Sequence, residues 1–552
     1  MHVLNGRSIP AGLVARREQT WRARAPLALD RGRPATARRP AGGPSRSTDL
    51  YNPTVTTRSD ERTLRAPAPE ASGPPVHTGL ALLVIMIGVL MAAVDTTIVV
   101  LALPEIEHSL HIALTGVIWI IIGYLLVITL LATQVGRLGD MFGRVRMYEA
   151  GFIIFIVGSA LCALASNEAT MVGFRVLQGV GGALISANSG AVIADIFPPE
   201  RRGRAFGFNA VGWSVGAILG ILLGGLIVTY IDWRWIFWIN VPAGVVAFLL
   251  ALRVLHDKGE RRRQKLDVPG MVTLGLGVFG VLWAITQLTT SSFSPEVTGY
   301  LVGGLVCLVA FVLVERAQKA PMLDLSMFSI PTVSPTLLVS LFQSLANYAV
   351  LFLVIMYLQG VRHDTPLHAS LLLVPGYLVT ALVSPLVGRI ADRIGPFLPQ
   401  TVGLAIEVAA LFVYAQLGIS TAIWLVVVAA VANGIGGGAF WPANTTAIMR
   451  AVPPNQFGVG AGTLRTFGNV GMVFSFAVAI LVAGRAIPHS LAFAIFVGTT
   501  HLAPRLAGAF TSGCHAAFYT SIGFMMLSVL FSAGPMLRAR RRPTDAKVLA
   551  TD

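Results

Sequence analysis

The sequence of 552 residues is poor in charge and in cysteine. Asp, Glu, Lys and Arg make up only 12% of the chain, about half of their usual share in a soluble globular protein. Its three cysteines, Cys162, Cys307 and Cys514, lie far apart, so the sequence predicts neither a disulfide framework nor a cysteine metal site. The P-loop string G-x-x-x-x-G-K-[ST] and the zinc-peptidase string H-E-x-x-H are also absent. We therefore expect no enzyme, no metal, no cofactor and no ATP-driven pump in this chain alone.

Hydrophobic residues, in contrast, make up 55% of the chain and gather in long uninterrupted runs. We count about fourteen runs that reach the roughly 20 residues a helix needs to cross a bilayer. These runs predict an all-α polytopic protein embedded in a lipid bilayer. They lie near 79–103, 117–135, 148–166, 171–196, 206–230, 235–254, 270–288, 297–314, 333–358, 366–387, 399–418, 421–447, 460–483 and 515–537.

The basic residues give a net charge of +15, but their positions argue against a nucleic-acid partner. They lie in the N-terminal segment and in alternate short loops, whereas the opposite loops are nearly free of Lys and Arg. This positive-inside pattern predicts a multi-pass protein of the cytoplasmic membrane with both termini in the cytoplasm. The loop and tail residues are Arg201, Arg202 and Arg204; Arg261, Arg262, Arg263 and Lys265; Arg389 and Arg393; and the stretch 538–542.

Residues 1–77 are rich in Arg, Pro, Ala and Ser and contain no Lys. This composition predicts a disordered basic tail, and the lack of an apolar h-region argues against a cleavable signal peptide. Two interpretations stay open: a tail that contacts anionic lipid headgroups, or an extension upstream of the true start codon. Residues 538–552 are expected to form a short cytoplasmic tail.

A distinctive loop motif, G-R-L-G-D-M-F-G-R-V-R at 136–146, lies between two apolar runs. Its glycines allow a tight turn, and its arginines place it in the cytoplasm. A plain topology signal would need only positive charge, but Asp140 adds a carboxylate. The order G-R-L-G-D-x-x-G-R-x-R resembles the loop between helices 2 and 3 of the major facilitator superfamily. That resemblance implies a short loop whose charge network, built on Gly136, Asp140, Gly143 and Arg144, latches the two halves of a transporter in its outward-facing state.

We expect Asp140 to pair with Arg144. We also expect it to lie near the start of the run at Gly460, where a helix N-terminus carries partial positive charge.

The sequence also repeats itself. The stretch 388–395 echoes the loop motif, and the glycine-rich stretch 178–182 is echoed at 433–438. Weak internal symmetry is typical of transporters built from two related halves. The echoes align runs 1–6 with runs 9–14 and leave runs 7 and 8 as an inserted pair. This plan resembles the fourteen-span drug:proton antiporters, with six-helix halves at 78–256 and 319–537 and the inserted pair within 257–318.

Two charged residues in the apolar runs of the first half stand out by the strings that they begin. Asp95 begins a D-x-T-x-V-x-x-A-L-P string that resembles the first-span signature of the fourteen-span family. A carboxylate inside a span costs about 2.5–3.5 kcal/mol, so it usually faces a cavity or a partner. Arg175 begins an R-x-x-Q-G string that is tied to proton coupling in the superfamily. The alternatives are a water-solvated Asp95 near the span end and a snorkelling Arg175.

The fifth run carries glycines at a spacing of four, which form a groove for close helix packing. The groove resembles the family's antiporter motif, G-P-x-x-G-G, but Ile221 stands at the proline position, so we expect less bending. The groove residues are Gly212, Gly216, Gly220, Gly224 and Gly225.

The string W-R-W-I-F-W-I-N-V-P at 233–242 is an aromatic belt in its simplest interpretation. It also resembles the W-R-W-x-F-x-x-N-x-P string of the fourteen-span family.

Glu407 is the only acid within the runs of the second half, and its cost of burial favours a position in a substrate cavity. Aromatic and apolar walls with few polar groups suit a pocket of broad specificity. Candidate lining residues are Gln343, Asn347, Tyr348, Phe440, Trp441 and Asn444.

Together, the resemblance implies a proton-coupled secondary transporter that exports amphipathic small molecules, in which Asp95 and Arg175 couple the proton. Two alternatives stay open. The first is a narrow exporter of one endogenous metabolite, peptide or lipid. The second is a lipid-handling or partner-bound membrane component without solute antiport.

Overall fold

The computed structural model describes residues 78–112, 114–197, 199–257, 266–288, 293–318, 321–323, 325–452, 457–485 and 504–540. Every described residue belongs to the unit Gly73–Asp552. The predictions for residues 1–77, for the basic residues at 261–265 and for the tail after Arg540 lie outside the described residues.

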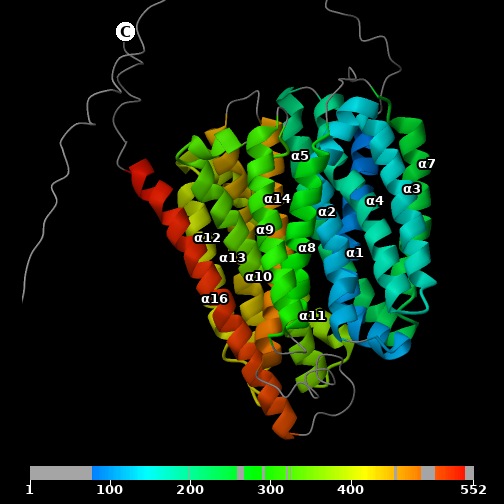
Figure 1. The fold of residues 1–552 in the computed structure, drawn as a ribbon, viewed down its shortest axis with the longest axis vertical. Helices are drawn as coiled ribbons and strands as arrows, with labels where there is room; N and C mark the ends of the chain where they lie inside the picture. The colour runs from blue at the N-terminus through cyan, green and yellow to red at the C-terminus, as the bar shows by residue number, and fades with distance from the viewer. Residues whose placement is uncertain are drawn as a thin grey trace, which may run out of the picture. The chain divides into compact units, whose positions relative to one another are not determined.

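The described residues form helices and connecting turns, without a β-strand among them (Figure 1). Each of the fourteen predicted runs lies on a helix or on two consecutive helices, so the predicted fold class is confirmed. Within the described residues, thirteen helices are long and apolar enough to span a membrane, and the number is fourteen if α2, which is bent by 57°, counts as one span. The helices are α1 (Thr78–Leu110), α2 (Leu114–Phe142), α3 (Arg144–Ala163), α4 (Glu168–Ile196), α5 (Pro199–Tyr230), α6 (Trp235–Trp238), α7 (Asn240–Val254), α8 (Val268–Gln287), α9 (Pro295–Ala317), the 3-10 helix η1 (Leu325–Ser329), α10 (Val333–Met356), the π-helix η2 (Tyr357–Val361), α11 (Pro366–Ile394), α12 (Phe397–Tyr414), α13 (Trp424–Ala451), α14 (Phe457–Arg485) and α16 (Pro504–Arg540).

The motif at 136–146 is not the short loop that the sequence predicted. α2 continues to Phe142 and α3 begins at Arg144, so Gly143 alone separates the two helices. Its φ of 108° lies where glycine carries no steric penalty, which lets one residue reverse the chain. Gly395 ends α11 at the corresponding place in the echo, with a φ of 92°. The repeated motif therefore gives a repeated turn.

One predicted run is shorter than its helix at both ends. α16 extends from Pro504 to Arg540, so it begins before the predicted run 515–537 and continues beyond it. The length criterion counts only apolar residues, whereas a helix continues through polar residues of good helix propensity.

Helix packing repeats between the first and last six spans. In the first set α1 packs on α5 and α2 on α4; in the last set α10 packs on α14 and α11 on α13. The repeated glycines explain why α2 packs closely on α4 and α11 packs closely on α13. A Cβ on Gly179 would lie 2.9 Å from the carbonyl oxygen of Tyr124 in α2, and one on Gly434 would lie 2.1 Å from that of Gly376 in α11. Only glycine allows such close backbone approach.

Two further contacts join the first set of helices to the last set: α5 packs on α11, and α2 packs on α14. The extra pair, α8 and α9, forms a hairpin, and α8 contacts both α2 and α14 (Figure 1). The hairpin therefore lies along one of the two seams between the sets.

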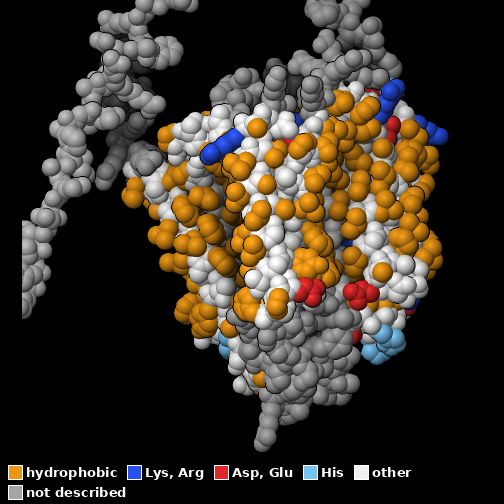
Figure 2. Space-filling model, in the orientation of Figure 1, with side chains coloured by type: hydrophobic (Ala, Val, Ile, Leu, Met, Phe, Trp, Pro, Cys, Tyr) orange, Lys and Arg blue, Asp and Glu red, His pale blue; other side chains and the backbone are white. Residues whose placement is uncertain are grey.

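The sides of the helices are apolar. Figure 2 shows hydrophobic side chains over most of the helix surfaces in view, with most visible Lys and Arg side chains at the end where α16 ends. Large apolar side chains such as Leu382 (75% exposed) and Leu530 (64%) have no protein cover. This distribution fits a lipid-facing surface. We call the end where α2, α11 and α16 terminate the Arg-rich end.

Candidate functional site

An ion pair is buried between α1 and α4. Arg175 Nη1 lies 2.8 Å from Asp95 Oδ2, and the two side chains are 2% and 0% exposed. Both alternatives raised from the sequence are therefore wrong: Asp95 is not solvated by water, and Arg175 does not snorkel to the surface. The helices bring together two residues that are 80 positions apart in the chain.

Gln178 forms hydrogen bonds with both members of the ion pair. Its Nε2 donates to Asp95 Oδ1 at 2.8 Å, and its Oε1 accepts from Arg175 Nη1 at 2.7 Å. Arg175 also donates from Nε to the Ile120 carbonyl at 3.1 Å, and its guanidinium lies 4.2 Å from the ring centroid of Tyr124. The sequence did not predict the role of Tyr124, since an aromatic residue in an apolar run carries no signal of its own.

This arrangement places two opposite charges against each other inside the bundle. Arginine stays protonated at any physiological pH, and a buried charge of one sign is tolerated only beside a charge of the other. Removal of either charge would therefore leave the other one buried and unbalanced.

A second charge network surrounds the turn between α2 and α3. Arg144 donates from Nε to Asp140 Oδ1 at 2.9 Å and from Nη1 to Asp195 Oδ1 at 2.6 Å. Asp195 lies at the end of α4. The side chains of all three are about one-third exposed, so each bond is partly screened by water. The expected approach of Asp140 to the start of α14 stays a prediction.

Two downstream segments also bind this turn. Asp257, after α7, accepts from the Val145 backbone N–H at 2.8 Å and lies against Gly143, whose Cβ would be 2.2 Å from the Asp257 Oδ2 atom. Arg137 donates to the carbonyl of Pro321, in the segment between α9 and η1. Any side chain at position 143 would collide with this carboxylate. The turn is thus tied to the ends of α4 and α7 and to the segment before α10.

Two buried carboxylates hold the segment that Arg137 contacts. Asp267 caps the start of α8 through the Gly270 N–H and accepts from the Met322 N–H at 3.0 Å. Glu315, near the end of α9, accepts from the Leu323 N–H at 2.9 Å. Each acid is 2% exposed. The sequence did not single out these residues, because their function depends on a backbone segment that only the fold brings near.

Glu407 of α12 lies inside the last set of helices. Its Oε1 and Oε2 accept from Gln343 Nε2 at 3.1 and 3.2 Å, and Oε1 also accepts from Asn347 Nδ2 at 3.1 Å. The residue is 0% exposed. Asn347 and Tyr348 are half-buried on α10, whereas Asn444 on α13 is fully buried and neither of its side-chain polar atoms has a hydrogen-bond partner.

The sequence matches the family model described as Major Facilitator Superfamily over residues 85–476. This chain is a member of that superfamily. The tetracenomycin C resistance and export protein of Streptomyces glaucescens is 33% identical over 416 residues, which cover 73% of this chain and 76% of that protein. The riboflavin transporter RibZ of Clostridioides difficile (strain 630) is 27% identical over 395 residues, which cover 71% of this chain and 85% of that protein.

A solved structure shows the same fold. The crystal structure of a bacterial homologue of the human lysosomal transporter Spinster, in an inward-facing and occupied conformation, matches with a TM-score of 0.58 at 17% identity. The match covers 85% of this chain and 98% of that chain. The protein is therefore a multi-pass secondary transporter with the facilitator fold, and not an enzyme.

The glycine groove of this facilitator packs on α1. A Cβ on Gly216 would lie 2.7 Å from the Leu90 carbonyl oxygen, and one on Gly220 would lie 2.7 Å from that of Val94. Gly225 instead faces α11, where its Cβ would meet Ser370. Residues 212–216 also match the letters G-x-S-x-G, but they lie within α5 rather than at a strand-to-helix turn, so they form no nucleophile elbow.

The tryptophan string of the facilitator is more than an aromatic belt. Trp235 is exposed, as a belt residue would be, but Trp233 and Phe237 are buried. The Phe237 ring lies 5.8 Å from the Arg175 guanidinium, and its carbonyl accepts from Ser159 Oγ at 2.9 Å. The string therefore forms part of the surroundings of the buried ion pair.

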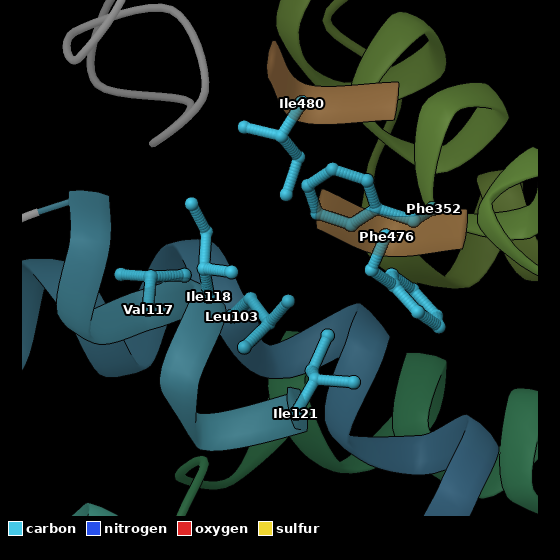
Figure 3. A pocket seen from close by; sticks show the side chains of 7 residues that line it. All are labelled: Leu103, Val117, Ile118, Ile121, Phe352, Phe476 and Ile480. Carbon is cyan, nitrogen blue, oxygen red and sulfur yellow. The ribbon is translucent and has the colours of Figure 1, made fainter. Parts of the chain in front are cut away.

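At the end of the facilitator opposite the Arg-rich end, α1 and α2 face α10 and α14 across a small apolar pocket. Figure 3 shows seven apolar side chains that converge from these helices. The space between them is only about 10 Å³, at the lower limit for one water molecule. Their surfaces are apolar, so water gains no hydrogen bonds there. The residues are Leu103, Val117, Ile118, Ile121, Phe352, Phe476 and Ile480.

Proposed function

We propose that this facilitator is a proton-driven exporter of amphipathic small molecules, of the fourteen-span drug:proton antiporter type. The observation that carries the proposal is the buried Asp95–Arg175 pair, because a coupled cycle needs a carboxylate inside the bundle that changes its partner. A relative named for resistance and export supports the direction of transport. An inward proton supplies about 2.3 kcal/mol per 100 mV of potential to offset outward movement of the solute.

In the proposed cycle, a proton that binds Asp95 removes its negative charge and its attraction to Arg175. The guanidinium then keeps the Gln178 oxygen, the Ile120 carbonyl and the Tyr124 ring. The contact between α1 and α4 weakens, and the solute cavity then opens to the other side of the membrane. Release of the proton restores the ion pair. Arg175 thus sets when the proton can bind, although it carries no transported proton itself.

The second part of the proposal concerns the latch. Gly136, Asp140, Gly143 and Arg144 would hold the Arg-rich end, which we place in the cytoplasm from the positive-inside pattern. The contacts of Arg144 with two carboxylates support a conformational role, since charge-assisted bonds at a helix turn have two discrete states, made and broken. The seven-residue apolar cluster would be the opposing gate.

For the substrate cavity we propose Asn347, Tyr348, Trp441 and Asn444, with Glu407 behind the amide of Asn347. The two unpartnered polar atoms of Asn444 leave donors and an acceptor for a solute or for water. We also propose the division into halves at 78–256 and 319–537, with an inserted pair between them. It rests on a packing pattern that recurs: α1 on α5 and α2 on α4 correspond to α10 on α14 and α11 on α13.

A narrow exporter is the alternative with a specific observation in its favour, because one relative is named as a riboflavin transporter. The deciding experiment uses purified protein in vesicles with an imposed pH gradient. Gradient-driven movement of several unrelated cationic and neutral dyes would support the broad exporter. Movement of riboflavin alone would support the narrow one, and the absence of any gradient-driven flux across the panel would contradict proton coupling.

A further inference from the structure

Glu407 is a buried carboxyl group without a cationic partner. It is 0% exposed, and within the described part of the chain the ion pairs join other acids. Asp267 and Glu315 are also buried outside those ion pairs, but backbone N–H groups donate to them, whereas side-chain amides donate to Glu407. Asp95, a buried acid of the first half, is paired with Arg175. An ionised carboxylate that leaves water loses its hydration, and a protein restores that loss with an opposite charge or with several good donors. Glu407 and Asp95 therefore face opposite electrostatic conditions.

The groups around Glu407 are neutral. From α10 it receives the amides of Gln343 and Asn347, at 3.1–3.2 Å. From α13 it is approached by Gly436 and Gly437, which have no side chain to offer. Among these described contacts of Glu407, none supplies a positive charge.

The same amides can also accept a hydrogen bond from a protonated Glu407 carboxyl group. The carbonyl oxygens Gln343 Oε1 and Asn347 Oδ1 are buried and have no hydrogen-bond partner. The oxygen and nitrogen of an amide exchange places on a 180° rotation and are nearly indistinguishable in shape. With one amide turned, its oxygen accepts the O–H of a carboxylic acid while the other amide donates to the acid's carbonyl oxygen. The neutral acid is then hydrogen-bonded by the same two amides that bind the carboxylate.

We infer that Glu407 is a second proton-binding site, which holds its proton in this conformation. The proton comes from water and forms an O–H bond on the Glu407 carboxyl group. It returns to water when α10 separates from α12 and the carboxylate regains hydration. This site adds a second proton to the cycle proposed above and to that extent rests on it, but the protonated state itself does not depend on transport.

The test is infrared spectroscopy of the full-length protein in lipid vesicles near neutral pH, without substrate or gradient. The wild type should show a carbonyl stretching band of a protonated carboxylic acid that shifts in deuterated water. Glu407→Gln should lose the Glu407 component of this band, which the difference between wild-type and variant spectra separates from any contribution of the other buried acids, Glu107, Asp267 and Glu315. Asp95→Asn and Glu296→Gln should keep it, because Asp95 is an ion-paired carboxylate and Glu296 is exposed at the start of α9.

Glu407→Asp serves as the second variant if Glu407→Gln folds poorly: it should shift the band rather than remove it, because the acid stays but its hydrogen bonds lengthen. An unchanged band in both variants, or no such band in the wild type, would overturn the inference. Failure of dye transport in a protein that shows the band would count against the proposed function and leave this site standing.

Discussion

Replacing Asp95 by Asn separates proton coupling from structural support. Asn keeps the size of the side chain but cannot take up a proton or balance the charge of Arg175. The guanidinium, 2% exposed, would keep Gln178, the Ile120 carbonyl and the Tyr124 ring as partners. Removing one member of a buried ion pair costs about 3–5 kcal/mol, because the other charge stays buried and unbalanced. The three remaining partners of Arg175 place our expectation at the lower end, about 3 kcal/mol.

The double variant Asp95→Asn/Arg175→Gln supplies the matched control. It removes both charges, so most of the lost stability should return, since replacing a whole buried pair by neutral groups is often close to neutral. Transport should not return, because neither side chain can then exchange a proton. Stability is measured as the thermal unfolding midpoint in detergent, and coupling as dye accumulation in vesicles driven by a pH gradient.

We expect the order of midpoints to be wild type, then the double variant, then Asp95→Asn, with gradient-driven accumulation in the wild type alone. Full accumulation by Asp95→Asn would refute the coupling role of this acid. Equal midpoints for Asp95→Asn and wild type would refute the energetic importance of the ion pair, whatever the transport result.

Four further predictions concern the rest of the molecule. Asp140→Asn removes the negative charge from a partly exposed bond with Arg144 that is worth about 1 kcal/mol, so transport should slow about fivefold while dye binding is retained. Lost binding with normal alternation would contradict the latch. Gly220→Ala places a Cβ 2.1 Å from Thr97 Oγ1 and should cost about 1–3 kcal/mol of stability by overpacking, whereas Gly299→Ala, with nothing within 4 Å, should be neutral; equal unfolding midpoints would disprove the tight α1–α5 contact. Excision of 258–318 with a short linker removes two spans, so the orientation of both halves should stay unchanged. Transport should slow, because Asp267 and Glu315 no longer hold the segment that Arg137 contacts. A reporter fused after residue 451 that moves to the outer side would contradict the topology. Glu407→Gln should reduce transport of a cationic dye more than of a neutral one, since only the cation gains from the carboxylate once it ionises; equal losses would remove Glu407 from substrate selection.

The sequence by itself determined the membrane fold. A bilayer imposes a length and an apolar composition on each span, and both are local properties of the chain. All fourteen predicted runs are therefore found on helices. The repeat was also local in origin: Gly143 and Gly395 stand at matching turns because only glycine takes their positive φ without strain. The ends of the helices were less accurate, because the apolar criterion stops before the helical backbone does.

Which polar groups meet was decided only by the tertiary structure. Asp95 and Arg175 are separated by 80 positions and Gln343 and Glu407 by 64, so their contacts depend on how each helix is rotated about its axis. The sequence identifies Asp95 and Arg175 as costly to bury. It does not determine whether each of them contacts water or whether they pair with each other. The hydrogen bonds that Asp267 and Glu315 accept from the backbone of residues 322 and 323 left no signal in the sequence, because any acid can accept from a backbone N–H. The sequence shows that a charged residue lies in a span and is costly to bury, whereas helix packing determines which partner offsets that cost.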